Sequence, residues 1–260
     1  MRLRFTARPV TLLLLILLGS PGYSLPDAPN TAPIASKEAL QYGVEWRLIR
    51  AGQANITFDP NTVDGKPAYN VTLRLQSAGM VSKLYKVDDS YVAQASGQLC
   101  ADNLVLNAEE GKRKRQTKVT FDRERGKVHY LERDLVNNTT VAANEIDTPP
   151  CVHEILSGLY RARMLKLEPG QSATIPITDG KKLANVKFEA QEREEVSTPT
   201  GKHKTIRYEA YLFNGALYAK SARCLVWMTD DARRTPVQIQ VRMRLLIGTI
   251  TLTLEKEERG

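Results

Sequence analysis

Apolar and polar residues alternate along most of this chain, which is the pattern of β-strands with one buried face. Near the N-terminal end the alternation is carried by Leu40, Tyr42, Val44, Trp46 and Leu48. Near the other end it is carried by Val237, Ile239, Val241, Met243, Ile250, Leu252 and Leu254. Turn residues such as Gly, Asp and Pro separate these segments, so the sequence predicts a β-meander at each end of the domain.

One segment, residues 149–170, breaks this pattern and predicts a helix. Two prolines lead into it, a Pro-Gly pair follows it, and its apolar residues recur at helical spacing. These residues are Val152, Ile155, Leu156, Leu159 and Tyr160. We predict a mainly β fold, with a large curved antiparallel sheet or incomplete barrel of about a dozen strands. The sheet would pack around this one α-helix of roughly four turns.

The first 24 residues have the features of a secretory signal peptide. Three arginines precede an apolar run from Val10 to Leu18 that is too short to cross a bilayer. We therefore predict a signal peptide at residues 1–24, a Pro-rich leader at 25–37 and a single β-rich domain at 38–258. Export to the periplasm is expected, with no transmembrane span after signal removal.

Charge and cysteine content bear on the environment. The net charge of +8 falls by three when the signal arginines are removed. A modestly basic exported protein can meet anionic headgroups or glycans, although the same excess can serve only to solubilise a surface. The three cysteines, Cys100, Cys151 and Cys224, permit one disulfide and leave one thiol. Cys224 lies in an apolar strand segment, which favours it as the free thiol, but the sequence leaves the pairing open.

The stretch WMTDDARRTPV, Trp227 to Val237, raises the question of an active site. Asp230 and Asp231 lie beside Arg233 and Arg234, which would suit acid–base chemistry or a metal. Neighbouring strand residues point to opposite faces, so the carboxylates share a site only if the chain bends. Asp, Arg and Pro between two alternating segments are also what a polar hairpin loop needs. We favour the loop interpretation.

The strongest charge run, GKRKRQTK, contains Lys112, Arg113, Lys114 and Arg115. Such a run can hold an anionic polymer or a lipid headgroup. It can also be an exposed strand, at the edge of the sheet, that its charges protect from aggregation. We favour the strand interpretation, and nucleic acid is not an expected partner of an exported protein.

Other familiar chemistries lack a motif in this chain. The residues CVHE, Cys151 to Glu154, do not have the paired spacing of a zinc site. We interpret them as the first turn of the helix, with Glu154 at its positive end. Ser157 is not on a strand-to-helix elbow, an apolar strand does not activate Cys224, and no glycine-rich phosphate loop occurs. The sequence thus predicts no catalytic residue, no metal and no cofactor.

Four stretches occur in an order that resembles a known family. They are EALQYGVEWRLIRAG, SGLYRARMLKLEPGQ, REEVSTPTGKHKTIRYE and VWMTDDARRTPVQIQV. Together, over about Glu38 to Leu254, they resemble an uncharacterised exported bacterial family, domain of unknown function 3108. The resemblance implies an envelope location and a mainly β fold, and it brings no activity. Glu154 stands where an Asp is expected. The recurring blocks contain Tyr42, Trp46, Gly52, Ser157, Tyr160, Arg163, Gly201, Trp227, Asp231 and Pro236.

These observations favour a non-catalytic envelope protein that binds an apolar or anionic envelope component, a lipid or a glycan, or acts as a structural partner of another envelope protein. A large curved sheet can enclose an apolar cavity, which is an analogy at the level of the fold. The expected ligand-binding residues are Tyr160, Arg163, Trp227, Asp230, Asp231, Arg233 and Arg234. The alternative is a hydrolase of envelope glycan or peptide that uses Asp230, Asp231 and Glu45 as carboxylates.

Overall fold

The computed structural model describes residues 36–212, 222–243 and 248–260. The predicted signal peptide, residues 1–24, and residues 25–35 of the predicted leader lie outside the described residues, so both remain predictions.

Within the described residues the chain forms fourteen strands and two helices. The strands are β1 (Glu38–Trp46), β2 (Ile49–Val63), β3 (Lys66–Ser77), β4 (Val87–Ser96), β5 (Ala101–Glu110), β6 (Arg113–Asp122), β7 (Lys127–Asp134), β8 (Thr139–Asp147), β9 (Ser172–Thr178), β10 (Leu183–Thr198), β11 (Gly201–Ala210), β12 (Ala222–Thr229), β13 (Pro236–Met243) and β14 (Thr249–Arg259). The helices are α1 (Gly79–Leu84) and α2 (Ile155–Arg163).

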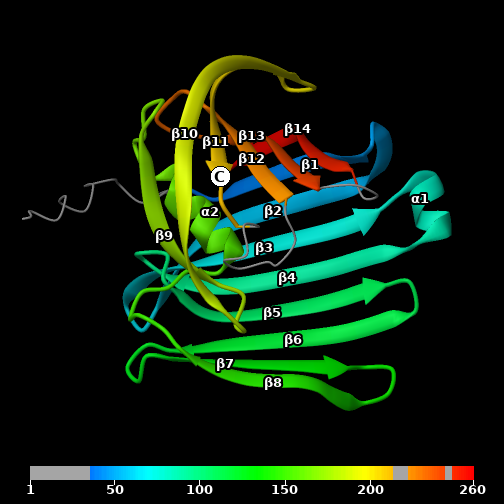
Figure 1. Ribbon diagram of the computed structural model, residues 1–260, viewed down its shortest axis with the longest axis vertical. Coiled ribbons are helices and arrows are strands. Elements are labelled where there is room, and N and C mark those ends of the chain that lie inside the picture. Colours follow the sequence, from blue (N-terminus) through cyan, green and yellow to red (C-terminus); the bar gives the residue numbers. More distant parts are fainter. Residues whose placement is uncertain (1–35, 213–221, 244–247) are drawn as a thin grey trace, which may run out of the picture. The chain divides into compact units, whose positions relative to one another are not determined.

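All fourteen described strands belong to one antiparallel sheet, in the order β8-β7-β6-β5-β4-β3-β2-β1-β14-β13-β12-β11-β10-β9 (Figure 1). The first strand pairs with the last, so the two predicted meanders are neighbours in the middle of the sheet. Buried residues face each other there, as in the pairs of Tyr42 with Leu254 and Val44 with Leu252. The edge strands β8 and β9 are not paired with each other. The prediction of a mainly β fold with a large, unclosed antiparallel sheet is confirmed.

Three details differ from the sequence-based prediction. A second, six-residue helix, α1, occupies the connection from β3 to β4, in addition to the one helix that the sequence predicted. Helix α2 has nine residues and ends at Arg163, well before the Pro-Gly pair. The basic run does lie in a strand, β6, but this strand pairs with both β5 and β7, so only the position at the edge of the sheet is wrong. Alternation reveals a strand but not its neighbours, since pairing partners are set by the rest of the sheet.

The segment before α2 connects two distant parts of the sheet. The amide of Ala101, at the start of β5, donates to the carbonyl of Val152 at 2.8 Å. On the other side, His153 donates to Pro176 and accepts from Thr178, both in β9. The edge strand β9 is therefore held beside the start of β5 by this segment, which carries the sheet around α2.

The core lies on both sides of α2. Leu156 and Tyr160 belong to a cluster with residues of β1, β2, β3 and β14. Ala162, with the half-buried Ile155 and Leu159, packs against residues of β9 to β12. Because the helix buries apolar side chains in two directions, it is enclosed by the sheet and not laid on its surface. Helix α2 accordingly lies between β9 and β2–β4 in Figure 1.

The cysteine question is settled by the structure. Cys100 and Cys151 form a disulfide, with their Cα atoms 4.9 Å apart. It links the start of β5 to the segment before α2 and so supports the same connection as the Ala101–Val152 hydrogen bond. Cys224 is free and buried, as the apolar strand around it predicted.

Candidate functional site

Helix α2 begins at a carboxylate that accepts several hydrogen bonds from protein groups. Glu154 is the N-cap, and its side chain accepts the backbone amides of Leu156 and Ser157 while the Ser157 hydroxyl accepts the amide of Glu154. This reciprocal pair forms a capping box and satisfies amides that the helix would otherwise leave free. The hydroxyl of Tyr91, from β4, also donates to Glu154. Burial raises the pKa of Glu154, and these donors oppose that rise.

One face of α2 carries a buried ion pair. Arg163 donates from both terminal nitrogens to Glu38, at 2.6 and 2.9 Å, and both side chains are only 2% exposed. Tyr160 donates its hydroxyl to the same carboxylate at 3.2 Å, and Arg259 approaches it at 3.4 Å. The pair therefore joins the beginning of β1, the end of α2 and the end of β14.

The charges of this pair are stabilised by each other. Burial would raise the pKa of Glu38, but the hydrogen bonds and charges of Arg163 and Arg259 outweigh it and hold the pKa below the ordinary value. Burial would likewise lower the pKa of Arg163, and Glu38 raises it. Both groups are consequently charged at neutral pH. Buried charges of this kind are tolerated because they are paired and hydrogen-bonded to each other.

Within the Trp227 to Val237 stretch, residues 230–235 form the connection between β12 and β13, in agreement with the loop interpretation. Arg163 also donates to the backbone carbonyls of Arg233 and Arg234. Asp231 shapes the turn, because it accepts the amides of both arginines at 3.0 Å. Burial acts to raise the pKa of Asp231, but the Thr229 hydroxyl, which donates to it at 2.8 Å, together with these amides and the charge of Arg233 holds the pKa below its ordinary value.

The two adjacent carboxylates of this loop have different partners. Asp230 accepts from Arg193, in β10, at 2.8 Å, whereas Asp231 is bound to its own turn. Glu45 lies at the far end of β1 from Glu38, the residue beside this loop. The three carboxylates of the hydrolase hypothesis thus do not converge in the described residues.

The remaining predicted site residues of this region also have protein partners. Trp227 is buried and donates from its ring nitrogen to Glu194 at 2.7 Å. Arg234 donates to the hydroxyl of Tyr208. Tyr160, Arg163 and the loop carbonyls do come together, but the arrangement is a closed internal network. Their role in ligand binding stays a prediction.

The basic run of β6 and the turn before it is largely neutralised by neighbouring strands. Lys112 lies in the turn, and Arg113 and Lys114 are next to the carboxylates of Glu110 and Glu109. Arg115 pairs with Glu132 of β7 at 2.5 Å. Cross-strand pairing of this kind reduces the positive potential that an anionic polymer would meet.

The opposite face of α2 borders an apolar cavity of about 170 Å³. The helix contributes Ile155, Leu156, Gly158, Leu159 and Ala162 to its wall. The remaining wall comes from both halves of the sheet and from Leu212, just after β11. It consists of Ile56, Leu73, Ile175, Ile177, Val186, Phe188, Ala210, Leu212, Cys224, Val226, Ile239 and Leu252. A cavity of roughly 150 Å³ lined by such residues can stay dry and hold a benzene ring.

The α2 residues that the sequence analysis singled out, Tyr160 and Arg163, do not line this cavity. The cavity is bordered instead by apolar residues of the helix, among them the small Gly158 and Ala162. Gly158 also lets the helix approach β9, since an added Cβ would lie 2.9 Å from the Ile177 side chain. In the sequence, a Gly and an Ala four residues apart within the helix indicate that this side of the helix can approach its neighbours closely.

The chemistry of this cavity is that of apolar binding. Its one thiol, Cys224, has its pKa raised to about 12 by burial, and the charge of Glu209 acts in the same direction. At neutral pH it is therefore a protonated, unreactive group. No cluster of three or more metal-ligating acidic, His or Cys side chains occurs among the described residues.

A fold with one open sheet wrapped around a helix, and an apolar cavity beside that helix, places this chain among β-barrel-like proteins. A β-barrel-like protein of domain of unknown function DUF1849 from Brucella abortus has the same fold. Its TM-score is 0.53 at 5% identity, over 86% of this chain and 98% of that chain. No helix in the described residues has the length and apolar character to span a membrane.

The chain belongs to the family described as protein of unknown function (DUF3108), whose model matches residues 41–255. The predicted resemblance is therefore confirmed. No curated protein matches the chain. Two further structures are more distant. A protein with a YmcC-like fold from Bacteroides fragilis has a TM-score of 0.36 at 9% identity, over 85% of this chain and 95% of that chain. A DUF1089 family protein from Pseudomonas aeruginosa has a TM-score of 0.32 at 14% identity, over 89% and 95%.

Removing one partner of the buried ion pair tests its structural role. Arg163→Met leaves the Glu38 carboxylate buried without its main partner, so we expect a loss of about 3–5 kcal/mol in the free energy of unfolding. The double variant Glu38→Gln with Arg163→Met should recover part of that loss. The control is Arg193→Met, which loses only exposed ion pairs. Urea unfolding measures all three, and equal losses in Arg163→Met and Arg193→Met would contradict the assignment.

The buried ion pair of Glu38 and Arg163 also predicts how the free energy of unfolding depends on pH. Because the folded-state pKa of Glu38 lies below its ordinary 4.5, its contribution is complete above that pH and is lost as the pH falls through the folded value. The stability advantage of the parent over Glu38→Gln should therefore shrink below about pH 4.5. Glu154, with its raised pKa, titrates in the opposite sense but is present in both proteins. A constant difference between the two proteins from neutral to acid pH would refute the prediction.

Proposed function

We propose that this protein is exported to the periplasm and binds an apolar group of an envelope lipid, without catalysing a reaction. The observation that carries the proposal is the apolar cavity between α2 and the sheet. Its volume of about 170 Å³ suits a single ring or the end of an acyl chain better than a whole lipid. Each buried methylene of such a chain would contribute about 0.8 kcal/mol.

A row of paired residues connects this cavity to one end of the sheet. Ala210 and Cys224 line the cavity and pair with each other, and the row continues through Val241 and Ile250 to Trp46. Beyond Trp46 the β1–β2 turn begins. The cavity residues Ala210 and Cys224 therefore lie at the same level along the strands as this end of the sheet.

Exposed apolar side chains gather at this end of the sheet, which we call the apolar end. Helix α1 is held next to the start of β2 by the hydrogen bond from Ala78 to Ala51. The apolar end consists of Trp46, Leu48, Ile49, Met80, Leu84 and Tyr85, of which Leu48 and Leu84 are 92% and 82% exposed. The exposed basic residues Arg47, Lys83 and Lys86 lie among them. Apolar side chains flanked by basic ones suit contact with an anionic lipid surface.

Filling the cavity tests the binding site directly. We expect octanoic acid and 1-octanol to bind the mature protein, and Ala210→Phe to weaken both by at least about tenfold because its ring occupies the space. Ala142→Phe is the matched control, since Ala142 is half-buried in the edge strand β8, away from the cavity. Titration calorimetry gives the affinities. Unchanged affinity in Ala210→Phe, or no binding by the parent, would end the proposal.

Charging the apolar end tests whether the apolar group comes from a lipid surface. Leu48→Glu with Leu84→Glu should reduce binding to vesicles of phosphatidylethanolamine and phosphatidylglycerol by at least about tenfold. The control is Leu135→Glu with Val136→Glu, which charges exposed apolar residues of the β7–β8 turn. Cosedimentation measures the bound fraction. If both pairs of substitutions have the same effect, contact through the apolar end is ruled out.

A further inference from the structure

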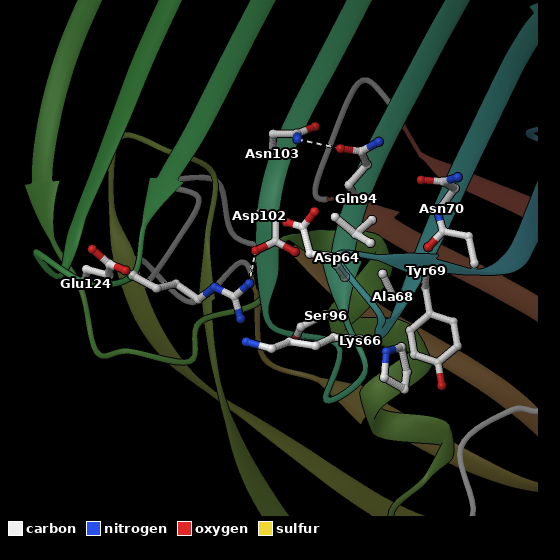
Figure 2. A pocket seen from close by; sticks show the side chains of 15 residues that line it. Asp64, Lys66, Ala68, Tyr69, Asn70, Gln94, Ser96, Asp102, Asn103 and Glu124 are labelled. Atoms are coloured by element: carbon white, nitrogen blue, oxygen red, sulfur yellow. Dashed lines mark hydrogen bonds and ion pairs between the residues drawn. The ribbon is translucent and has the colours of Figure 1, made fainter.

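A second hollow, of about 630 Å³, lies on the face of the sheet that points away from α2 (Figure 2). We call it the polar groove. It lies where the β2–β3 hairpin, the end of β4, the start of β5 and the turn after β6 meet. Its amide residues alternate with core residues such as Val71, so they face outward. These amides are Asn61, Asn70, Gln94 and Asn103.

Small side chains and a tight turn form the hollow. Ala68 pairs with Ser96 across β3 and β4, so two small residues lie side by side. The β2–β3 connection has positive φ at both Asp64 and Gly65, which is the geometry of a two-residue hairpin turn. This hairpin carries Asp64 to the wall of the groove. The strand and turn sequences thus account for the hollow, and no helix or strand has to move to form it.

Three buried polar atoms of the groove residues lack a hydrogen-bond partner in the protein. They are Oδ1 of Asn61, Oδ1 of Asn70 and Oγ of Ser96. An unsatisfied buried polar atom is costly, and native structures contain few of them. Because the three atoms border one hollow, a molecule inside it would supply all of them with partners.

The neighbouring amides are oriented by each other. Asn103 donates from its side-chain nitrogen to the Gln94 side-chain oxygen at 2.6 Å, as the dashed line in Figure 2 shows. This contact uses one end of each amide. An NH₂ group of one and a carbonyl oxygen of the other are left to donate to and accept from a ligand. The groove therefore offers both acceptors and a donor in fixed positions.

The charges of the groove argue against an ionic ligand. Its lining contains the acids Asp64, Asp102 and Glu124 and the bases Lys66 and Arg123. Arg123 is already paired with Asp102, whose pKa is raised by burial and lowered by that partner. An anion would meet unpaired acceptor oxygens and a small excess of acid, in a chain that is basic as a whole. A divalent cation would need more carboxylates close together, and the described residues contain no such cluster.

We propose that the polar groove binds a neutral saccharide. A sugar hydroxyl is both donor and acceptor, so hydroxyls can donate to Asn61, Asn70 and Ser96 and accept from Gln94. The volume lies within the range of small-ligand sites. The one aromatic residue of the lining, Tyr69, is buried against Phe58, so recognition rests on hydrogen bonds. The groove uses none of the residues of the apolar cavity, and either site can fail without the other.

The test measures binding of maltose, cellobiose and N,N′-diacetylchitobiose to the mature protein by NMR, using the side-chain NH₂ signals of asparagine and glutamine. At least one sugar should shift the Asn70 and Gln94 signals. Asn70→Ala with Gln94→Ala should weaken it by at least about tenfold. The melting temperature should stay close to that of the parent, since Asn70 Oδ1 has no protein partner to lose.

The control is Asn107→Ala, an amide of the same outer face that is satisfied by Gln116 at 2.9 Å and lies outside the groove. It should leave sugar binding unchanged. The proposal is overturned if none of the three sugars shifts the groove signals, if the double variant binds like the parent, or if inorganic phosphate or Ca²⁺ shifts those signals and the sugars do not. Ala210→Phe, which fills the apolar cavity, should bind the sugar as the parent does, so the sugar result does not depend on the result for the apolar cavity.

Discussion

Two charged side chains, Glu38 at the start of β1 and Arg163 at the end of α2, meet in the interior of the sheet. The same guanidinium holds the carbonyls of the β12–β13 connection, and the same carboxylate receives Tyr160 and Arg259. Both ends of the described chain and its buried helix are thereby joined at one point. Removing charges from water is costly, so such a pair persists where its geometry and additional hydrogen bonds are complete. This condition determines the rotation and depth of α2 within the sheet.

Once the rotation of α2 is determined, its two faces acquire different properties. The face with Tyr160 and Arg163 closes against β1 and the β12–β13 connection through polar contacts. The face with Ile155, Leu159 and Ala162 turns toward β9 to β12 and borders the cavity through apolar side chains. A closely packed core would normally fill such a space, because each missing contact forfeits dispersion energy.

Alternation was sufficient to predict the strands and the fold class, because one face of each strand meets the core and the other meets water. It could not predict that β6 lies inside the sheet or that β1 pairs with β14, since the sequence of one strand does not encode its neighbours. The sequence likewise raised the question of an active site at the adjacent carboxylates Asp230 and Asp231. In the structure Asp231 accepts hydrogen bonds from its own turn, and Asp230 accepts from Arg193. The two hollows were missed for the opposite reason. Both depend on small or neutral residues at positions that become adjacent only in the folded sheet.

The sheet separates the two proposed sites by chemistry as well as by space. Along β3, Val71 and Leu73 face the core around α2, while Asn70 faces the polar groove. A single β layer therefore has hydrocarbon on one side and unsatisfied amides on the other. No ligand reaches both sites through that layer, because its backbone is fully hydrogen-bonded to β2 and β4. The two proposals therefore call for two separate groups, an apolar one reached from the apolar end and a hydroxyl-rich one at the opposite ends of these strands. The proposed location, an envelope in which lipid and glycan lie close together, would present both.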